Sequence, residues 1–276
     1  HASATATGPV VDRGAGSGRL VRVVHRPGSV QTEIRIGHPG LPRRVPDYHA
    51  VSVMSAILGG LFNSRLNMQL REAKGYTYGA SAGFDMRRGA GPFSARAAVN
   101  TEVTVPAVID TLTELERMRD TQVKASELAA ARDFLVGVFP LRFETPGAVA
   151  AALSGLAIHG LPVEELVEYR RRIEAVGIDE AAAAAREHLR IDEAAIVLVG
   201  DADAIGPLLE AAGLGTVVIE HDEAPLALGP MPGGREVAVD AGEDEGPTVG
   251  AEDPDLPGAA DDPAAADSHT DDRKTP

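Results

Sequence analysis

Residues 57–79 read ILGGLFNSRLNMQLREAKGYTYG. The adjacent glycines Gly59 and Gly60 interrupt a helical pattern, and a second short helix is expected to run from Arg65 to Ala73. Gly75 tolerates the left-handed backbone conformation that closes a helix. From Tyr76 onward the larger side chains occupy alternate positions, which predicts a strand. This one stretch therefore predicts a glycine hinge, a short helix and the start of a strand.

Two polar side chains in this stretch are candidates for chemistry. Arg71 lies near the end of the short helix, and Tyr78 is expected three residues into the strand that follows. A turn at Lys74-Gly75 is expected to bring the guanidinium and the phenol to one wall. Both groups donate hydrogen bonds at neutral pH. Fixed donors suit a peptide carbonyl that gains negative charge during attack, so we interpret Arg71 and Tyr78 as candidate catalytic residues that support the substrate carbonyl and the transition state.

The elements on either side of the stretch indicate strands, a helix and a hairpin. The predicted strands around the turn Pro27-Gly28-Ser29, at 20–26 and 30–37, are expected to pair antiparallel. A helix is predicted from Tyr48 to Leu58, with Asp47 as its N-cap. The strand that begins at Tyr76 is expected to run to Met86 and to form a hairpin with a strand at 93–99.

After Asn100 the apolar pattern changes to a helical period. Helices are predicted at 104–118, 125–139, 148–159, 163–175 and 179–189, the last capped by Asp179. A strand at 194–199, a helix at 204–212 and a strand at 216–220 follow. Strands that cluster apart from helices predict an α+β fold, here an antiparallel sheet covered by a block of helices.

The chain divides into three parts. Residues 1–18 are small and Gly-rich and are expected to form a linker, 19–223 a folded domain, and 224–276 a disordered, acidic, Pro/Gly/Ala-rich tail. The segment 236–276 holds 13 acidic and 2 basic residues, so most of the net charge of −15 lies there. The chain begins with His1 and not Met, which leads us to expect a fragment or a processed product.

Composition excludes several classes of function. Without the acidic tail the chain is nearly neutral, which argues against nucleic-acid binding; the arginine pairs and runs at 43–44, 87–88 and 170–172 are interpreted as solvated surface. The chain has no cysteine, and its apolar runs are shorter than the roughly 18 residues of a membrane span. We expect no membrane partner and a cytoplasmic location.

Zinc-ligand spacing is also missing from the sequence. None of the eight histidines is paired at the i, i+4 spacing that presents two imidazoles to one zinc ion. Glu187-His188 comes nearest to the inverted motif His-x-x-Glu-His, but Ala184 occupies the position of its first histidine. Nucleophile and phosphate-binding motifs are missing as well. We therefore expect no metal and no cofactor in this chain.

The stretch 57–79 resembles the second-domain signature of the M16 zinc metallopeptidases, the pitrilysin, insulinase and mitochondrial processing peptidase group. The resemblance lies in the glycine hinge, the turn at 63–66, the pair Arg71 and Tyr78, and Gly75-Tyr76-Thr77. The resemblance covers about 20–220 and is sharpest between Pro46 and Asn100. It implies an M16/LuxS-like metalloenzyme half-domain, the C-terminal half that binds no zinc. In this family two such halves enclose a chamber, and Arg71 and Tyr78 match the pair that contacts the peptide near its scissile carbonyl.

The resemblance also implies partners. Zinc is expected in a catalytic M16 half, either upstream in the same polypeptide or in a separate subunit, and this chain alone is expected to be inactive toward its peptide substrate. One alternative is a non-catalytic structural or assembly subunit of the same fold. Another is an unrelated α+β binding domain, which a different sheet order would support.

Overall fold

The computed structural model describes residues 19–221. The predicted linker at 1–18 and the predicted tail at 224–276 lie outside these residues. The strands are β1 (Leu20–His25), β2 (Gln31–Pro39), β3 (Ala80–Phe84), β4 (Pro92–Asn100), β5 (Ala195–Gly200) and β6 (Thr216–His221). The α-helices are α1 (Tyr48–Ser55), α2 (Arg65–Asn67), α3 (Thr104–Asp120), α4 (Ala125–Val138), α5 (Pro146–His159), α6 (Glu164–Val167), α7 (Tyr169–Ala175), α8 (Ile178–His188) and α9 (Ala202–Ala212). Two π-helical segments, η1 (Ala56–Gly60) and η2 (Met68–Ala73), and three 3-10 segments, η3 (Thr101–Val103), η4 (Pro140–Phe143) and η5 (Ile191–Glu193), complete the set.

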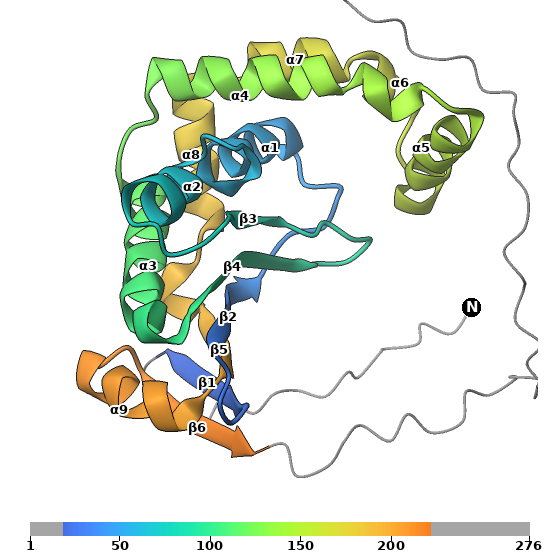
Figure 1. The fold of residues 1–276 in the computed structure, drawn as a ribbon. Coiled ribbons are helices and arrows are strands. Elements are labelled where there is room, and N and C mark those ends of the chain that lie inside the picture. Colours follow the sequence, from blue (N-terminus) through green and yellow to red (C-terminus); the bar gives the residue numbers. More distant parts are fainter. Residues whose placement is uncertain (1–18, 222–276) are drawn as a thin grey trace, which may run out of the picture. The chain divides into compact units, whose positions relative to one another are not determined.

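The strands form one six-stranded sheet in the order β3-β4-β2-β5-β1-β6 (Figure 1). The hairpin of β3 and β4 is confirmed, with Ala80 opposite Ala97 and Phe84 opposite Phe93. The expected antiparallel pair of β1 and β2 is wrong, because β5 lies between them, parallel to β1 and antiparallel to β2. β6 is also parallel to β1, so the sheet is mixed. The turn at Pro27-Gly28-Ser29 joins two strands that are not neighbours in the sheet.

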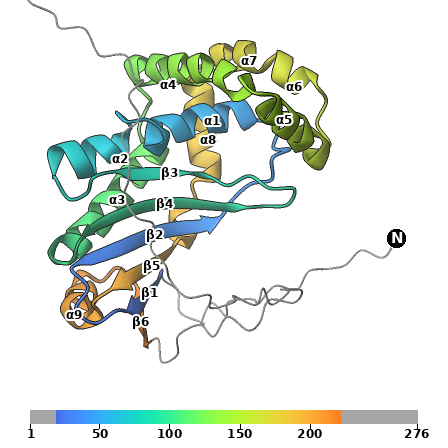
Figure 2. The same cartoon turned by 45° about the vertical axis from the view of Figure 1, so that its right-hand side comes forward.

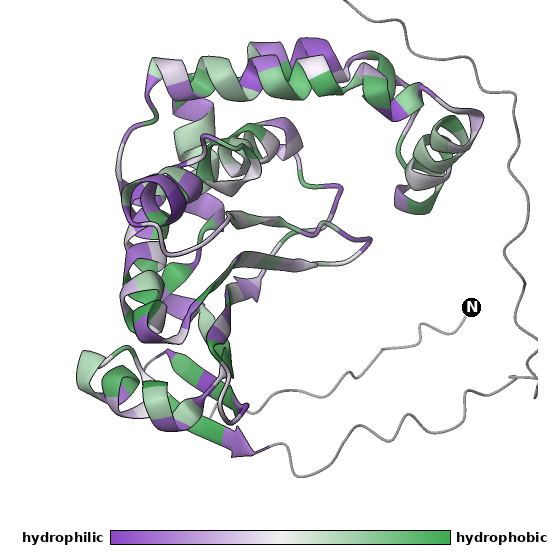
Figure 3. Cartoon of the chain, viewed as in Figure 1, coloured by the Kyte–Doolittle hydropathy of each residue, from purple (hydrophilic) through white to green (hydrophobic). Residues whose placement is uncertain are grey.

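Helices cover one face of this sheet (Figures 1 and 2). Helices α1, α3, α8 and α9 contact one another or the strands, and α4 and α7 pack together over α1. Along β2 and β4 alternate side chains are buried under these helices, while the side chains between them face the open side of the sheet. The α+β class predicted from the sequence is confirmed. Hydrophobic and hydrophilic residues alternate along α3 and α4, as expected of helices with one buried face (Figure 3).

Several element boundaries differ from the sequence predictions. Helix α1 passes directly into the π-helical segment η1, which ends at Gly60, two residues beyond the predicted end at Leu58. Helix α8 begins after Gly177, whose backbone N–H donates to Glu180, so Asp179 is not its cap. Asp47 does precede α1, but its side chain makes no capping hydrogen bond and lies 2.8 Å from His188 Nε2.

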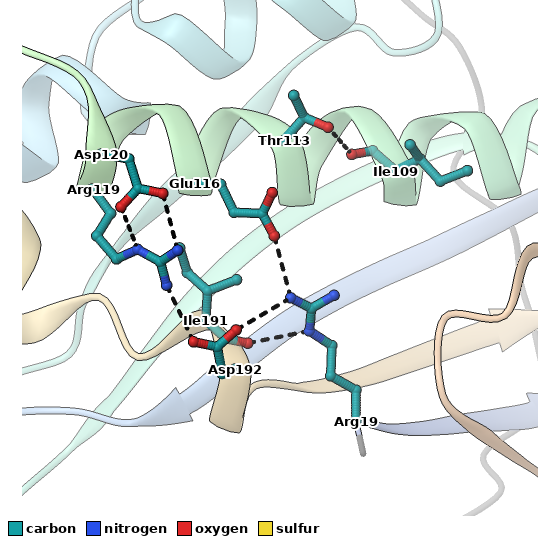
Figure 4. Close-up of polar contacts among 8 residues, drawn as sticks. All are labelled: Arg19, Ile109, Thr113, Glu116, Arg119, Asp120, Ile191 and Asp192. Carbon is teal, nitrogen blue, oxygen red and sulfur yellow. Dashed lines mark hydrogen bonds and ion pairs between the residues drawn. The ribbon is translucent and has the colours of Figure 1, made fainter. Parts of the chain in front are cut away.

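An ion-pair cluster fastens the beginning of β1 to the helical layer (Figure 4). Arg19 lies 3.3 Å from Glu116 of α3 and donates to the backbone oxygen of Ile191 in η5. Asp192 of the same segment lies 3.3 Å from Arg119 of α3. These contacts join residues far apart in the sequence. Within residues 19–221, every helix is too short or too polar to cross a lipid bilayer.

A second ion pair, between Arg65 and Glu127, makes the stability of the fold depend on pH in the acid range. Two guanidinium nitrogens of Arg65 lie 2.9 and 2.8 Å from the Glu127 carboxylate, which also accepts from the backbone N–H of Lys124. Burial alone raises the pKa of Glu127, but these hydrogen bonds outweigh it and hold the pKa below its ordinary value. The carboxylate therefore stabilises the fold above its ordinary pKa of about 4.3, and this contribution is lost as the pH falls through the lowered pKa.

We predict that Glu127→Gln lowers the free energy of unfolding at neutral pH by about 1–3 kcal/mol, because it removes a partly buried charged hydrogen bond. Urea unfolding from about pH 6 to about pH 3 should show a smaller loss of stability for the variant than for the wild type. Glu174→Gln, on an exposed position of α7, is the matched control. Equal acid dependence in wild type and Glu127→Gln would show that the pair does not carry this effect.

Candidate functional site

The candidate site begins with close packing of the hinge against the sheet edge. A Cβ on Gly59 would lie 2.2 Å from the backbone nitrogen of Ala82 in β3, whereas at Gly60 the nearest atom, the backbone oxygen of Ser55, would be 3.3 Å away. Only glycine at position 59 lets η1 approach β3 this closely. The first of the two hinge glycines thus sets the spacing between the hinge and the edge strand.

Asn67 joins the short helix to the same edge strand. Its Nδ2 donates to the backbone oxygen of Leu61 at 3.0 Å, and its Oδ1 accepts from the backbone N–H of Ala80 at 2.8 Å. The side chain is buried. The two hydrogen bonds fix where β3 begins relative to the hinge.

The segment between η2 and β3 is a closed turn. Gly75 has a φ of 65°, and the backbone N–H of Tyr76 donates to the oxygen of Leu70 at 2.8 Å. The hydroxyl of Thr77 then donates to the oxygen of Gly79 and accepts from its N–H. These local bonds hold the segment out of the sheet. The predicted strand from Tyr76 to Met86 is therefore too long, since β3 covers only Ala80–Phe84.

Arg71 lies in η2, as the sequence predicted for the end of the short helix. Its guanidinium carbon stands 4.2 Å above the centre of the Phe62 ring, and its Nε lies 3.5 Å from Glu72 Oε1. About a third of the side chain is exposed, at 35%. A cation over an aromatic face is held by the negative charge of the ring face. Arg71 is thus a partly open, oriented cation.

Tyr78 lies in the turn and not in the strand. It is 95% exposed, and among the described residues no hydrogen bond or ring contact holds it. The loop therefore presents both the ring and the hydroxyl to the surroundings. No hydrogen bond or ring contact joins Tyr78 to Arg71 within residues 19–221, so the one-wall arrangement expected from the sequence stays a prediction.

Arg43 is not the solvated surface that the sequence suggested, whereas its neighbour Arg44 is exposed. Arg43 lies 3.5 Å from Glu165 of α6, and both side chains are largely buried, with 16% and 14% exposed. Its guanidinium carbon also lies 3.4 Å from the centre of the Tyr48 ring. Arg172 of α7 binds the same Glu165. Because the partners come from distant parts of the chain, the local charge pattern gave no sign of this buried network.

Two groups of residues bring His and carboxylate atoms close together, and in both the imidazole already has a hydrogen-bond partner within the fold. His25 Nδ1 accepts from the backbone N–H of Ala202, so in the neutral ring Nε2, the atom that faces Asp203, carries the proton. In the second group His188 Nε2 is occupied by Asp47. Ala184, where the inverted motif has its first histidine, is buried in α8.

Sequence reasoning missed two contributors to the site. Phe62 orients Arg71, whose guanidinium lies over its ring. The Phe62 side chain is itself 69% exposed. Arg96 lies on the open face of β4, beside Ser81 of β3 and opposite Arg35 of β2. Arg96 falls within the strand predicted at 93–99, but the local sequence gave no sign of which residue would lie opposite it.

Comparison with known proteins bears on the fold of this chain. The family model for the "Peptidase M16 inactive domain" matches residues 4–135. The peptidase M16 inactive domain from Pseudomonas fluorescens is 26% identical over 67% of this chain and 44% of that one, with a TM-score of 0.62. A protease from Helicobacter pylori has the same coverage at 17% identity and a TM-score of 0.61.

A chain described as a candidate zinc protease from Bordetella pertussis Tohama I is 20% identical, with a TM-score of 0.52. The match covers 61% of this chain and 93% of that one. The chain spans 44% of the length of the first two structures. No curated protein matches. The similarity to the Helicobacter pylori and Bordetella pertussis structures, both below 25% identity, shows a shared fold.

Proposed function

Because the chain is a relative of the M16 peptidases and carries the fold of their inactive domain, we propose that it is the C-terminal, substrate-contacting half of an M16 zinc metalloendopeptidase. The catalytic half, with its zinc, is either upstream in the same polypeptide or a separate subunit. The two halves enclose a chamber in which peptides are cleaved. This chain supplies binding and transition-state support.

One observation carries the proposal. The turn after η2 leaves Tyr78 95% exposed and without an internal partner among residues 19–221, while Arg71 is held over Phe62 on the preceding segment. An exposed phenol on a surface turn offers a bound peptide both an apolar ring and a hydrogen-bonding tip. The Thr77–Gly79 hydrogen bonds fix the backbone position from which the phenol projects. In the assembled enzyme Tyr78 and Arg71 donate hydrogen bonds to the oxygen of the scissile peptide bond.

The alternative, a structural or assembly subunit of the same fold, differs in what it requires of these side chains. A purely structural subunit needs the hinge, the sheet and the buried ion pairs, and it makes no use of an exposed phenol. The two functions therefore predict different results when Tyr78 and Arg71 are replaced in the complete enzyme.

The simplest test uses the full 276-residue chain by itself. We predict that, after purification and dialysis against a chelator, it retains no stoichiometric zinc and hydrolyses no peptide, with or without added zinc. Elemental analysis and a quenched fluorescent peptide library measure the two properties. A stoichiometric metal that survives chelation and supports hydrolysis would place a catalytic centre in this chain and refute the division of roles.

A further inference from the structure

The open face of the sheet carries a transverse row of arginines. Arg96 of β4 lies directly opposite Arg35 of β2, and Arg35 in turn lies opposite Val197 of β5, whose other neighbour is Arg22 of β1. The outward positions of β2 and β4 leave Arg35 and Arg96 exposed. Like charges directly opposite each other destabilise a pair of strands. The row thus has a cost in stability that a bound anion would offset.

Two of these three arginines have carboxylate partners. Arg35 folds back along its own strand to Glu33, 3.1 Å away, and Arg22 lies 2.8 Å from Glu220. Arg96 turns the other way, and its Nε donates to Ser81 Oγ at 2.7 Å. Within residues 19–221 no carboxylate lies within ion-pair distance of Arg96. The two terminal nitrogens of its guanidinium are left to bind something else.

The space in front of Arg96 is a hollow of about 480 Å³. Its walls come from three adjacent strands and from the turn that ends at β3, and the lining residues are Glu33, Arg35, Gly79, Ala80, Ser81, Arg96, Ala97 and Ala98. Because Glu33 pairs with Arg35, the net charge of the lining is that of Arg96. Ala98, on the same face of β4 as Arg96, has a short side chain that leaves space beside it. A guanidinium presents a planar fork that matches a carboxylate.

The position of the hollow ties it to the candidate site. Gly79, one of its lining residues, directly follows Tyr78. The residue that follows Tyr78 thus forms part of the wall of the hollow, which lies beside the turn that carries the phenol. A Glu side chain is long enough to extend into an open hollow, and its two oxygens fit the two free terminal nitrogens.

We propose that the hollow between β2, β4 and β3 is a binding subsite for an acidic side chain of the peptide substrate, with Arg96 as the residue that binds the carboxylate. The Ser81 hydroxyl orients Arg96, and Arg35 on the opposite strand is neutralised by Glu33. This subsite rests on the proposed function, and it adds the substrate class: peptides with Asp or Glu near the scissile bond.

The test measures binding and not turnover, so that it does not depend on the catalytic half. Two short fluorescent peptides, identical except for a central Glu or Gln, are titrated with the full 276-residue chain at low ionic strength, and anisotropy gives the two dissociation constants. We expect the Glu peptide to bind about three- to tenfold more tightly, the range of a single ion pair with good hydrogen-bond geometry. Arg96→Gln should remove the preference and leave the affinity for the Gln peptide unchanged.

Three variants keep the test specific. Arg186→Gln removes the same charge from an exposed position of α8, in the helical layer, and should retain the preference. Arg96→Lys should retain part of it, because the charge remains without the fork. Arg96→Glu should reverse it toward a Lys-containing peptide. Circular dichroism confirms that each variant is folded.

Equal affinity of the wild-type chain for the two peptides, or no measurable binding of the Glu peptide, would overturn the subsite. A preference that survives Arg96→Gln would do the same. A different result would contradict the proposed function and leave the subsite standing. In that case Tyr78→Phe would not change the turnover of the complete enzyme, while the chain would still prefer the Glu peptide.

Discussion

Tyr78→Phe lowers the turnover of the complete two-half enzyme by about 100-fold or more, because it removes one hydrogen-bond donor to the oxygen that becomes negative in the transition state. The effect should lie mainly in kcat, since a bond that strengthens in the transition state contributes little to ground-state binding. Arg71→Ala should cost at least as much, because it removes a charged donor. Steady-state kinetics with a peptide substrate and the zinc-containing half measure both variants.

The chain offers a matched control for the loss of a hydroxyl. Tyr76→Phe makes the same chemical change two residues away, at a side chain that packs against the core. It should leave kcat within about twofold of the wild type, since its hydroxyl has no assigned role in the chemistry. If Tyr78→Phe left kcat as little changed as Tyr76→Phe does, while the enzyme stayed folded, Tyr78 would have no catalytic role. That result would favour the alternative, a structural or assembly subunit.

Gly59→Ala destabilises the folded chain by about 2 kcal/mol or more, whereas Gly60→Ala changes stability by less than about 1 kcal/mol. The added Cβ at position 59 would stand 2.2 Å from the backbone nitrogen of Ala82 and 2.8 Å from its Cβ. Backbone atoms cannot rotate away, so η1 and β3 must separate, and overpacking of this kind typically costs about 1–3 kcal/mol. At position 60 the closest contact is 3.3 Å, and alanine also favours helix.

Urea unfolding of the two variants measures this difference. The pair is informative because the substitution, the neighbouring sequence and the helix propensity are the same. Similar stabilities for Gly59→Ala and Gly60→Ala would mean that the hinge does not pack against β3 as described. Because β3 follows directly from the turn that carries Tyr78, Gly59→Ala should also lower turnover.

Local sequence patterns predicted much of the fold. The alternation in β2 and β4, the helical period of α3 and α4, and the glycines at 60 and 75 depend on near neighbours, and the structure confirms these elements. The order of the strands in the sheet, in contrast, depends on contacts between residues that are distant in the sequence. The insertion of β5 between β1 and β2 joins residues near Ile34 to residues near Leu198, and no local pattern in either strand encodes it.

The candidate site shows the same division. Arg71 was placed correctly on the short helix. Tyr78 was assigned to a strand because Tyr76, Tyr78 and Ala80 alternate, but the Thr77 hydroxyl bonds to Gly79 and closes a turn there instead. Phe62 and Arg96 were missed because their roles come from what lies beside them in space. For the same reason Arg43 was taken for surface although Glu165, far along the chain, buries it.

The division of labour between two halves is tested most directly by adding this chain to the zinc-containing half. Peptide cleavage is followed while the full 276-residue chain is titrated into a fixed amount of that half, with each protein also measured alone. We predict negligible cleavage by either one alone, and activity that rises to a plateau at one chain per catalytic half. Full activity of the zinc half alone, or no gain on mixing two folded proteins, would contradict a substrate-contacting role for this chain.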